Sequence, residues 1–285
     1  MSVAREHIAV AVAPLRREPS HESECLTQAL HGEGFETLET SADGAWARVR
    51  LEADGYEGWL RSWYGAAVPG EGPGLRVRAR SAEIRASAKG VSEVLTSLPW
   101  QARLWELERA DTWTIVRLAD GRMGFVPTRL VEVADPPGGP PTPARLWRSA
   151  CRLVGAPYLW GGRSVWGYDC SGLVQAVLAW HGVAVPRDAR DQLARARRMR
   201  SPKKGEAPSQ VRAGKGDLLY FGPSPGAANH VALSAGNGEF LHAYGQVCLG
   251  SLNQNSQHYV PALVSTFLGV VHWRSLAPSE PPRSE

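Results

Sequence analysis

Cys170 stands where a cysteine can act as a nucleophile. It follows the glycine-rich stretch 155–169 and precedes residues 171–181, which are apolar at helical spacing. The start of a helix presents unpaired N–H groups and partial positive charge, which lower the pKa of a thiol and favour the thiolate. The same N–H groups could hold the oxyanion of a tetrahedral intermediate. On this context alone, a buried and inert cysteine is an equally good interpretation.

Two histidines offer the acid–base partner that a thiolate needs. His230 begins an alternating stretch after a Gly/Pro loop, and His242 lies in the next stretch, after the turn Asn237-Gly238. Asn-Gly between such stretches is a strong hairpin signal, so we expect the two imidazoles side by side across a strand pair. One would exchange a proton with Cys170 and the other would orient it, as in a Cys-His-His triad. A two-histidine metal site is the weaker alternative, because no third ligand has suitable spacing, and no cofactor is expected.

The elements that must position these residues fill the C-terminal part of the chain. Apolar residues at helical spacing predict helices over 145–153 and 171–181. Four β-like runs follow, at residues 217–221, 231–234, 240–243 and 269–273. Helices followed by strands indicate an α+β domain over 144–275. A Pro/Gly linker over 135–143 precedes this domain, and the tail over 276–285 is expected to be disordered.

The N-terminal half contains an internal repeat. Residues 46–60 and 113–126 each hold a tryptophan, an alternating run, an Asp-Gly turn and, two residues later, Gly-aromatic-aliphatic. Alternation around Asp-Gly is typical of a β-hairpin, and a unit of about 65 residues with several short strands is a small barrel. The sequence thus predicts two small β-barrels, residues 1–68 and 75–134, with two unrelated hairpins as the alternative.

Composition narrows the class of protein. Of 285 residues, 43% are hydrophobic and 21% charged, which allows a buried core and excludes a wholly disordered chain. The net charge is +4, and the basic cluster over 195–204 has no nucleic-acid motif beside it, so we expect a solvated surface and no nucleic-acid partner. The four cysteines form no C-x-x-C pair and suit a reducing compartment, with two disulfides as the alternative. The apolar run 8–13 is too short for a signal peptide or a membrane span. We therefore expect a cytoplasmic protein without membrane insertion, or one whose secretion signal is missing from the sequence.

Together these motifs resemble a known family. Tyr-x-Trp-Gly-Gly, Asp-Cys-Ser-Gly-Leu, Asn-His-Val and a second histidine make residues 145–274 similar to the NlpC family of cell-wall cysteine peptidases. The repeated barrels resemble bacterial SH3-like domains, and the combination resembles the γ-D-glutamyl-L-diamino acid endopeptidases. The resemblance implies an α+β multidomain protein: two SH3-like β-barrels, then a papain-like α+β peptidase domain. It also implies cleavage between D-Glu and a diamino acid (diaminopimelate or lysine) in peptidoglycan-derived peptides with a free N-terminal L-Ala, which in the cytoplasm would be murein peptide recycling.

The resemblance also implies roles for single residues. Cys170 would be the nucleophile, His230 the general base and then acid, and His242 the residue that orients it. Three positions would bind substrate in the catalytic domain: Tyr158 at the oxyanion, Asp169 at the free α-amine and Ser171 at the D-Glu carboxylate. Trp160 and Trp166 flank the glycine-rich loop, and from that position we expect them to wall the cleft; the alternative for Tyr158 and Trp160 is a place in the core. Asp169 could instead only cap the helix.

Two further positions depend on the subgroup. In Pro186-Arg187-Asp188-Ala189, a serine often follows the aspartate, so Ala189 departs from the pattern and Asp188 or Arg187 would compensate. An acidic residue of the first barrel would wall off the site and help to bind the L-Ala amine. Glu57 and Tyr64 are the candidates, and the alternative for Glu57 is an exposed turn residue. Two other functions stay open: a non-catalytic cell-wall peptide-binding protein, and a cysteine acyltransferase on the same fold.

Overall fold

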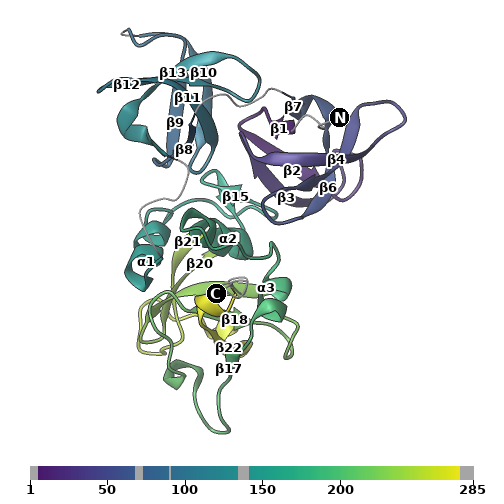
Figure 1. Ribbon diagram of the computed structural model, residues 1–285. Coiled ribbons are helices and arrows are strands. Elements are labelled where there is room, and N and C mark those ends of the chain that lie inside the picture. The colour runs from purple at the N-terminus through teal and green to yellow at the C-terminus, as the bar shows by residue number, and fades with distance from the viewer. Residues whose placement is uncertain (1–5, 68–72, 90, 134–140, 277–285) are drawn as a thin grey trace, which may run out of the picture. The chain divides into compact units, whose positions relative to one another are not determined.

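The computed structural model describes residues 6–67, 73–89, 91–133 and 141–276, which group into two compact units (Figure 1). The first unit holds the described residues up to 133 together with Leu159–Gly167, and the second holds the others. The segment 159–167, which the sequence assigns to the catalytic domain, thus groups with the N-terminal unit. Most of the predicted linker and tail lies outside the described residues.

The first unit contains two seven-stranded antiparallel sheets. The first sheet comprises β1 (Glu6–Ile8), β2 (Val12–Arg16), β3 (Cys25–Leu30), β4 (Gly34–Thr40), β5 (Trp46–Leu51), β6 (Glu57–Arg61) and β7 (Gly65–Ala66). The second sheet comprises β8 (Gly74–Val77), β9 (Ser81–Arg85), β10 (Val94–Pro99), β11 (Arg103–Arg109), β12 (Trp113–Arg117), β13 (Met123–Pro127) and β14 (Val131–Val133). The predicted hairpins are confirmed as β5–β6 and β12–β13.

The two sheets share one topology. Their strand orders are β3-β2-β6-β5-β4-β1-β7 and β10-β9-β13-β12-β11-β8-β14, which are identical when each strand is moved on by seven. A 3₁₀ helix follows the sixth strand in both, at Ser62–Tyr64 and Thr128–Leu130. Alternation places every second side chain inward, as in β9, where Ala82 and Ile84 are buried. Each sheet therefore buries an aliphatic cluster of its own.

The turn between β3 and β4 in the first sheet matches the turn between β10 and β11 in the second. Backbone N–H groups of residues 31–33 donate to carbonyls of the first sheet, and those of residues 100–102 do the same in the second. Gly32 and Gln101 occupy the same place, and each has a φ of 75°. A Cβ on Gly32 would lie 2.6 Å from the carbonyl oxygen of Arg103, so only glycine fits there. The next residue differs between the copies: Glu33 in the first turn is Ala102 in the second.

The second unit combines helices with a six-stranded antiparallel sheet of order β17-β22-β18-β19-β20-β21. The helices are α1 (Pro143–Cys151), α2 (Cys170–Trp180), α3 (Ala189–Arg195) and α4 (Pro261–Val264). The strands are β17 (Met199–Arg200), β18 (Leu218–Phe221), β19 (His230–Gly236), β20 (Glu239–Tyr244), β21 (Gln246–Ser251) and β22 (Phe267–Val271). The predicted helices over 145–153 and 171–181 are confirmed within two residues, whereas α3 and β21 were not predicted.

Helix α2 positions the candidate nucleophile. All of its residues except Ala179 are buried, and it packs against α1, β19 and β20. The helix begins after Asp169, whose side chain accepts a hydrogen bond from the N–H of Gly172, and ends before Gly182, which adopts a φ of 75°. The short strands β15 (Arg163–Ser164) and β16 (Gly167–Tyr168) pair just before it. No helix of the described part of the chain is long and apolar enough to cross a membrane.

Candidate active site

Cys170 is the first residue of α2 and is buried, with 8% of its surface exposed. Its Sγ lies 4.0 Å from the carbonyl oxygen of Asn229 and also receives backbone N–H groups of Ser171 and Val231. Asn229 and Val231 flank His230 along the chain. The thiol therefore lies against the backbone at the start of β19, where the candidate base is.

His230 and His242 are hydrogen-bonded to each other. The Nε2 atom of His230 lies 3.0 Å from Nδ1 of His242, with the rings nearly perpendicular at 86°. The hairpin β19–β20, paired at Leu233 and Leu241, brings them together as its Asn-Gly turn predicted. When His230 donates its Nε2–H to His242, a neutral ring keeps no proton on Nδ1. That bare nitrogen is free to accept a proton, so the pair suits a base and the residue that orients it.

Burial sets the protonation of this site. It lowers the pKa of His230 to about 3, helped by His242, and lowers the pKa of His242 to about 4. It raises the pKa of the Cys170 thiol to about 11, and Asp169 adds to that rise, against the N–H groups of Val231 and Ser171, which lower it. The prediction of a thiol pKa lowered by the helix start was therefore wrong, because loss of hydration outweighs those N–H groups. The free protein holds a neutral thiol beside neutral imidazoles.

Tyr158 is fixed by the turn between β20 and β21. Its N–H donates to the carbonyl oxygen of Gly245 over 2.9 Å, and its backbone bridges to Tyr168 on the other side. Burial raises the pKa of the Tyr158 phenol, and the charges of Cys170 and Asp169 raise it further. The phenol is thus protonated and within electrostatic reach of the thiol, as a hydrogen-bond donor to an oxyanion should be.

Tyr244, in the same turn, was missed by the sequence reasoning. Its ring stacks on His242, with centroids 6.0 Å apart and planes at 8°, although 71% of its surface is exposed. The signal was available, because Tyr244 follows His242 by two residues and so shares its face of β20. This turn therefore contacts both the orienting histidine and the backbone of Tyr158.

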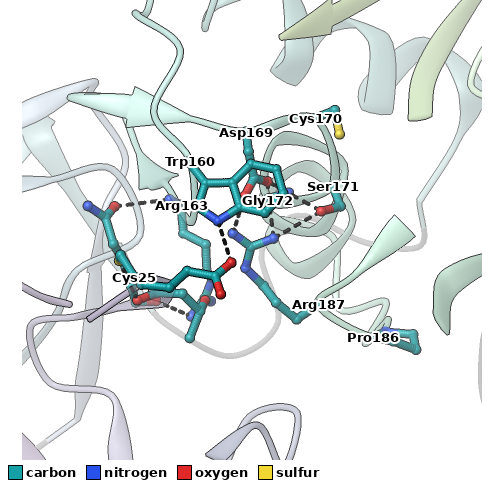
Figure 2. A network of polar contacts seen from close by, with 12 residues as sticks. Cys25, Trp160, Arg163, Asp169, Cys170, Ser171, Gly172, Pro186 and Arg187 are labelled. Carbon is teal, nitrogen blue, oxygen red and sulfur yellow. Dashed lines mark hydrogen bonds and ion pairs between the residues drawn. The ribbon is translucent and has the colours of Figure 1, made fainter. Parts of the chain in front are cut away.

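Asp169, Ser171 and Arg187 form a buried network (Figure 2). The guanidinium of Arg187 donates to both carboxylate oxygens of Asp169, at 3.0 and 2.5 Å, and to Oγ of Ser171 at 3.0 Å. Asp169 also accepts from the N–H of Gly172 at 2.6 Å, so it caps α2, as the alternative interpretation proposed. Only 2% of the surface of Arg187 is exposed. Both carboxylate oxygens of Asp169 therefore already have protein donors.

Asp188 and Ala189 follow this arginine at the start of α3. Asp188 is the N-cap residue, with extended backbone and no side-chain capping hydrogen bond, and Ala189 is buried in the first turn. The side-chain amide of Gln192 donates to the carbonyls of Ser171 and Pro186, which ties α3 to α2. The segment Pro186–Ala189, in which Ala189 replaces the expected serine, thus lies beside the network formed by Asp169, Ser171 and Arg187.

Three candidate residues belong to the first unit. The carboxylate of Glu57 accepts from Arg50 at 2.7 Å and lies 3.9 Å from Arg48. Tyr64 packs on the core of the first sheet and its ring contacts a neighbouring tryptophan. Trp160 is exposed, and its Nε1–H donates to Glu24 at 3.0 Å. The seven other predicted site residues belong to the second unit: Tyr158, Asp169, Cys170, Ser171, Asp188, His230 and His242.

Neither a metal centre nor a disulfide is formed by the residues that the structure describes. Within those residues, no three His, Cys, Asp or Glu side chains are grouped to hold an ion. Cys25, Cys151, Cys170 and Cys248 all carry free thiols.

Comparison with known proteins places this site in a family. Residues 155–265, which include Cys170, His230 and His242, match the NlpC/P60 family, and residues 15–62 match the bacterial dipeptidyl-peptidase Sh3 domain. Gamma-D-glutamyl-L-lysine dipeptidyl-peptidase of Bacillus subtilis is 30% identical over 234 residues, 76% of this chain and 71% of that protein. Dipeptidyl-peptidase 6 of Lysinibacillus sphaericus is 26% identical over 91% of this chain and 96% of its own length.

A solved structure agrees with the fold. The crystal structure of an NlpC/P60 family protein from Bacillus cereus superposes with a TM-score of 0.78 and 20% identity, over 94% of this chain and 99% of that one. The similarity therefore extends over both units and not only over the stretch that carries the thiol. The chain belongs to the NlpC/P60 family, with a bacterial SH3 domain before the catalytic stretch, and is a cysteine peptidase.

Proposed function

We propose that this peptidase cleaves the bond between γ-D-Glu and an L-diamino acid in peptidoglycan-derived peptides that begin with a free L-Ala. The observation that carries the proposal is the buried thiol of Cys170 beside the hydrogen-bonded pair His230 and His242. The name of the Bacillus subtilis relative supplies the substrate class. A dipeptidyl-peptidase releases two residues from the amino end, which here would be L-Ala-D-Glu.

The reaction follows from the protonation of the site. As Sγ of Cys170 bonds to the γ-carbonyl carbon of D-Glu, its proton passes to Nδ1 of His230. The phenol of Tyr158 and the N–H groups at the start of α2 receive the oxyanion. Collapse of this intermediate breaks the C–N bond, and His230 gives its proton to the departing amine. Water, deprotonated by His230, then hydrolyses the thioester, while the bond from His230 to His242 holds the ring in place.

We assign the charged groups of the substrate peptide to side chains that can pair with them. Asp169 is already held by Arg187 and the N–H of Gly172, so we assign it to capping α2 and anchoring Arg187. The free α-amine is then assigned to an acidic side chain, for which Glu57 stays the candidate, with Tyr64 and Trp160 as contacts, and Asp188 stays the candidate for the polar contact that Ala189 cannot make. Ser171, which Arg187 contacts, is assigned to the D-Glu carboxylate. A required free amine restricts the enzyme to released peptides, which fits recycling in the cytoplasm.

The test is product analysis. The protein is incubated with L-Ala-γ-D-Glu-meso-diaminopimelate, with the lysine peptide and with each peptide N-acetylated, and L-Ala-D-Glu is followed by mass spectrometry. We expect the dipeptide from the free peptides and none from the acetylated ones. Cys170→Ala should lose on the order of 10³-fold or more in rate. Absence of the dipeptide, or its undiminished release by Cys170→Ala, would contradict the proposal, and a product joined to an added amine would favour the acyltransferase.

A further inference from the structure

The segment Leu159–Gly167 joins two parts of the active site along the chain. It follows Tyr158 directly and ends two residues before Asp169, and it lies inside the stretch that matches the NlpC/P60 family. Its own contacts, however, group it with the N-terminal unit, where it packs on β3. A part of the catalytic stretch is thus held by residues that precede it by more than a hundred positions.

Arg163 makes the main attachment. Its backbone N–H donates to Oε1 of Gln28 at 3.0 Å, and its Nη1 donates to the carbonyl oxygen of Gln28 at 2.8 Å. The guanidinium also donates to both carboxylate oxygens of Glu33, at 3.2 and 3.1 Å. The side chains are buried, with 7% of Arg163 and 11% of Glu33 exposed. A buried charge pair of this kind is costly to break by removing one partner, so it holds the segment in one position.

Close packing adds to this attachment. A Cβ on Gly161 would lie 2.6 Å from the carbonyl oxygen of Cys25, and Gly161 has a φ of 75°, so no other residue fits. The Nε1–H of Trp160 donates to Glu24, the residue before Cys25 in the chain, at 3.0 Å. The carboxylate of Glu33 is itself fixed, because it accepts the N–H of Leu30 at 3.0 Å.

The repeat shows what is special about Glu33. The matching turn of the second sheet has Ala102 in its place, although the backbone hydrogen bonds of the two turns correspond. The second turn also has Pro99 in the place of Leu30, and proline has no N–H for a carboxylate to accept. The glutamate of the first copy therefore serves two partners, the N–H of Leu30 and the guanidinium of Arg163.

We propose that Arg163 and Glu33 are positioning residues of the peptidase, and that their buried ion pair fixes the segment between Tyr158 and Cys170. The first sheet then holds in place a segment of the stretch that matches the peptidase family. A misplacement of about 1 Å at a reacting group can cost about 10²-fold in rate, so a loosened segment should lower turnover. The proposal rests on the proposed function only for the choice of peptide.

The test compares Glu33→Gln, Arg163→Met and the milder Arg163→Lys with the full-length protein. Glu83→Gln is the matched control, because it removes a carboxylate from an exposed ion pair with Arg85 in the second sheet. For each variant, kcat and KM on the γ-D-Glu peptide, alkylation of Cys170 and hydrogen exchange of residues 159–168 are measured under conditions where far-UV circular dichroism shows it folded.

We expect Glu33→Gln and Arg163→Met to lower kcat by about 10- to 100-fold with KM changed less than about threefold, to speed exchange of the segment about tenfold, and to change the alkylation rate. The kcat and the exchange rate of Arg163→Lys should lie between those of the two stronger variants and those of the wild type. Glu83→Gln should have the same kcat and exchange rate as the wild type. Faster exchange with unchanged kcat and alkylation would overturn the proposal. If the wild type leaves the peptide uncut, the substrate assignment fails, and alkylation and exchange still decide the role of the pair.

Discussion

Removal of the Arg187 side chain should strongly destabilise the second unit. Arg187 donates to both carboxylate oxygens of Asp169 and to Ser171, with almost no exposed surface. Arg187→Met keeps most of the volume but takes the guanidinium away from the buried Asp169 carboxylate, which still accepts from the N–H of Gly172 and the hydroxyl of Ser171. Loss of one partner of a buried pair costs about 3–5 kcal/mol. For a domain of this size, that loss lowers Tm by about 6–20 °C.

The assay is urea unfolding followed by tryptophan fluorescence, since Trp180 is buried at the end of α2. The control is the pair Asp169→Asn with Arg187→Met, in which the amide oxygen still caps α2 through Gly172. The double variant should recover most of the lost stability, because no buried charge is left without its partner. If Arg187→Met costs less than about 1 kcal/mol, or if the two substitutions simply add, the buried pair does not stabilise α2 as described. If Asp169→Asn raises KM while the free energy of unfolding stays unchanged, Asp169 and not another carboxylate binds the substrate amine.

Four other outcomes follow from the site and its surroundings. His242→Ala should lower kcat about 10²-fold, and His242→Asn less, because an amide oxygen can still accept the Nε2–H of His230. Tyr244→Ala should lower kcat by roughly two- to tenfold through loss of the ring stack, and Tyr244→Phe should not. Because burial raises the pKa of Cys170 to about 11, its alkylation by iodoacetamide, mapped by mass spectrometry, should quicken about tenfold per pH unit between about pH 7 and 9; a rate already constant from about pH 5 would refute this. Burial lowers the pKa of His31 to about 4, so the unfolded chain takes up the proton first, and His31 alone should lower the free energy of unfolding by about 3 kcal/mol from about pH 7 to 4. His230 and His242, whose pKa values are also lowered, add to this fall, so the fall in His31→Gln should be smaller than in the wild type by about 3 kcal/mol.

The catalytic geometry was the part most accessible from the sequence. Its signals are local: a cysteine at the start of an apolar helix, and two histidines on either side of an Asn-Gly turn that fixes the strand pairing. The helix and the hairpin formed as those signals predicted. The repeated Asp-Gly hairpins identified both sheets for the same reason, because a tight turn and its alternating flanks specify the pairing without help from distant residues.

What the sequence could not supply depends on packing between distant segments. The raised pKa of Cys170 comes from burial, which no local motif encodes. The ion pairs of Arg187 with Asp169 and of Arg163 with Glu33 join residues far apart in the chain, and each arginine alone reads as a surface charge. Strand β21 has weak alternation, and its place is set by pairing along the whole length of β20.

The two corresponding turns, at residues 31–33 and 100–102, have the same backbone but different constraints on their side chains. At Gly32, the first copy admits no side chain, and its neighbour Glu33 holds an arginine of the peptidase stretch, so this turn cannot vary without a matching change elsewhere. The second copy keeps the same backbone with Gln101 and Ala102, and accepts a glutamine in the left-handed region, which costs about 1–2 kcal/mol. The same backbone turn therefore carries a buried attachment to Arg163 in the first copy and a glutamine in the left-handed region in the second.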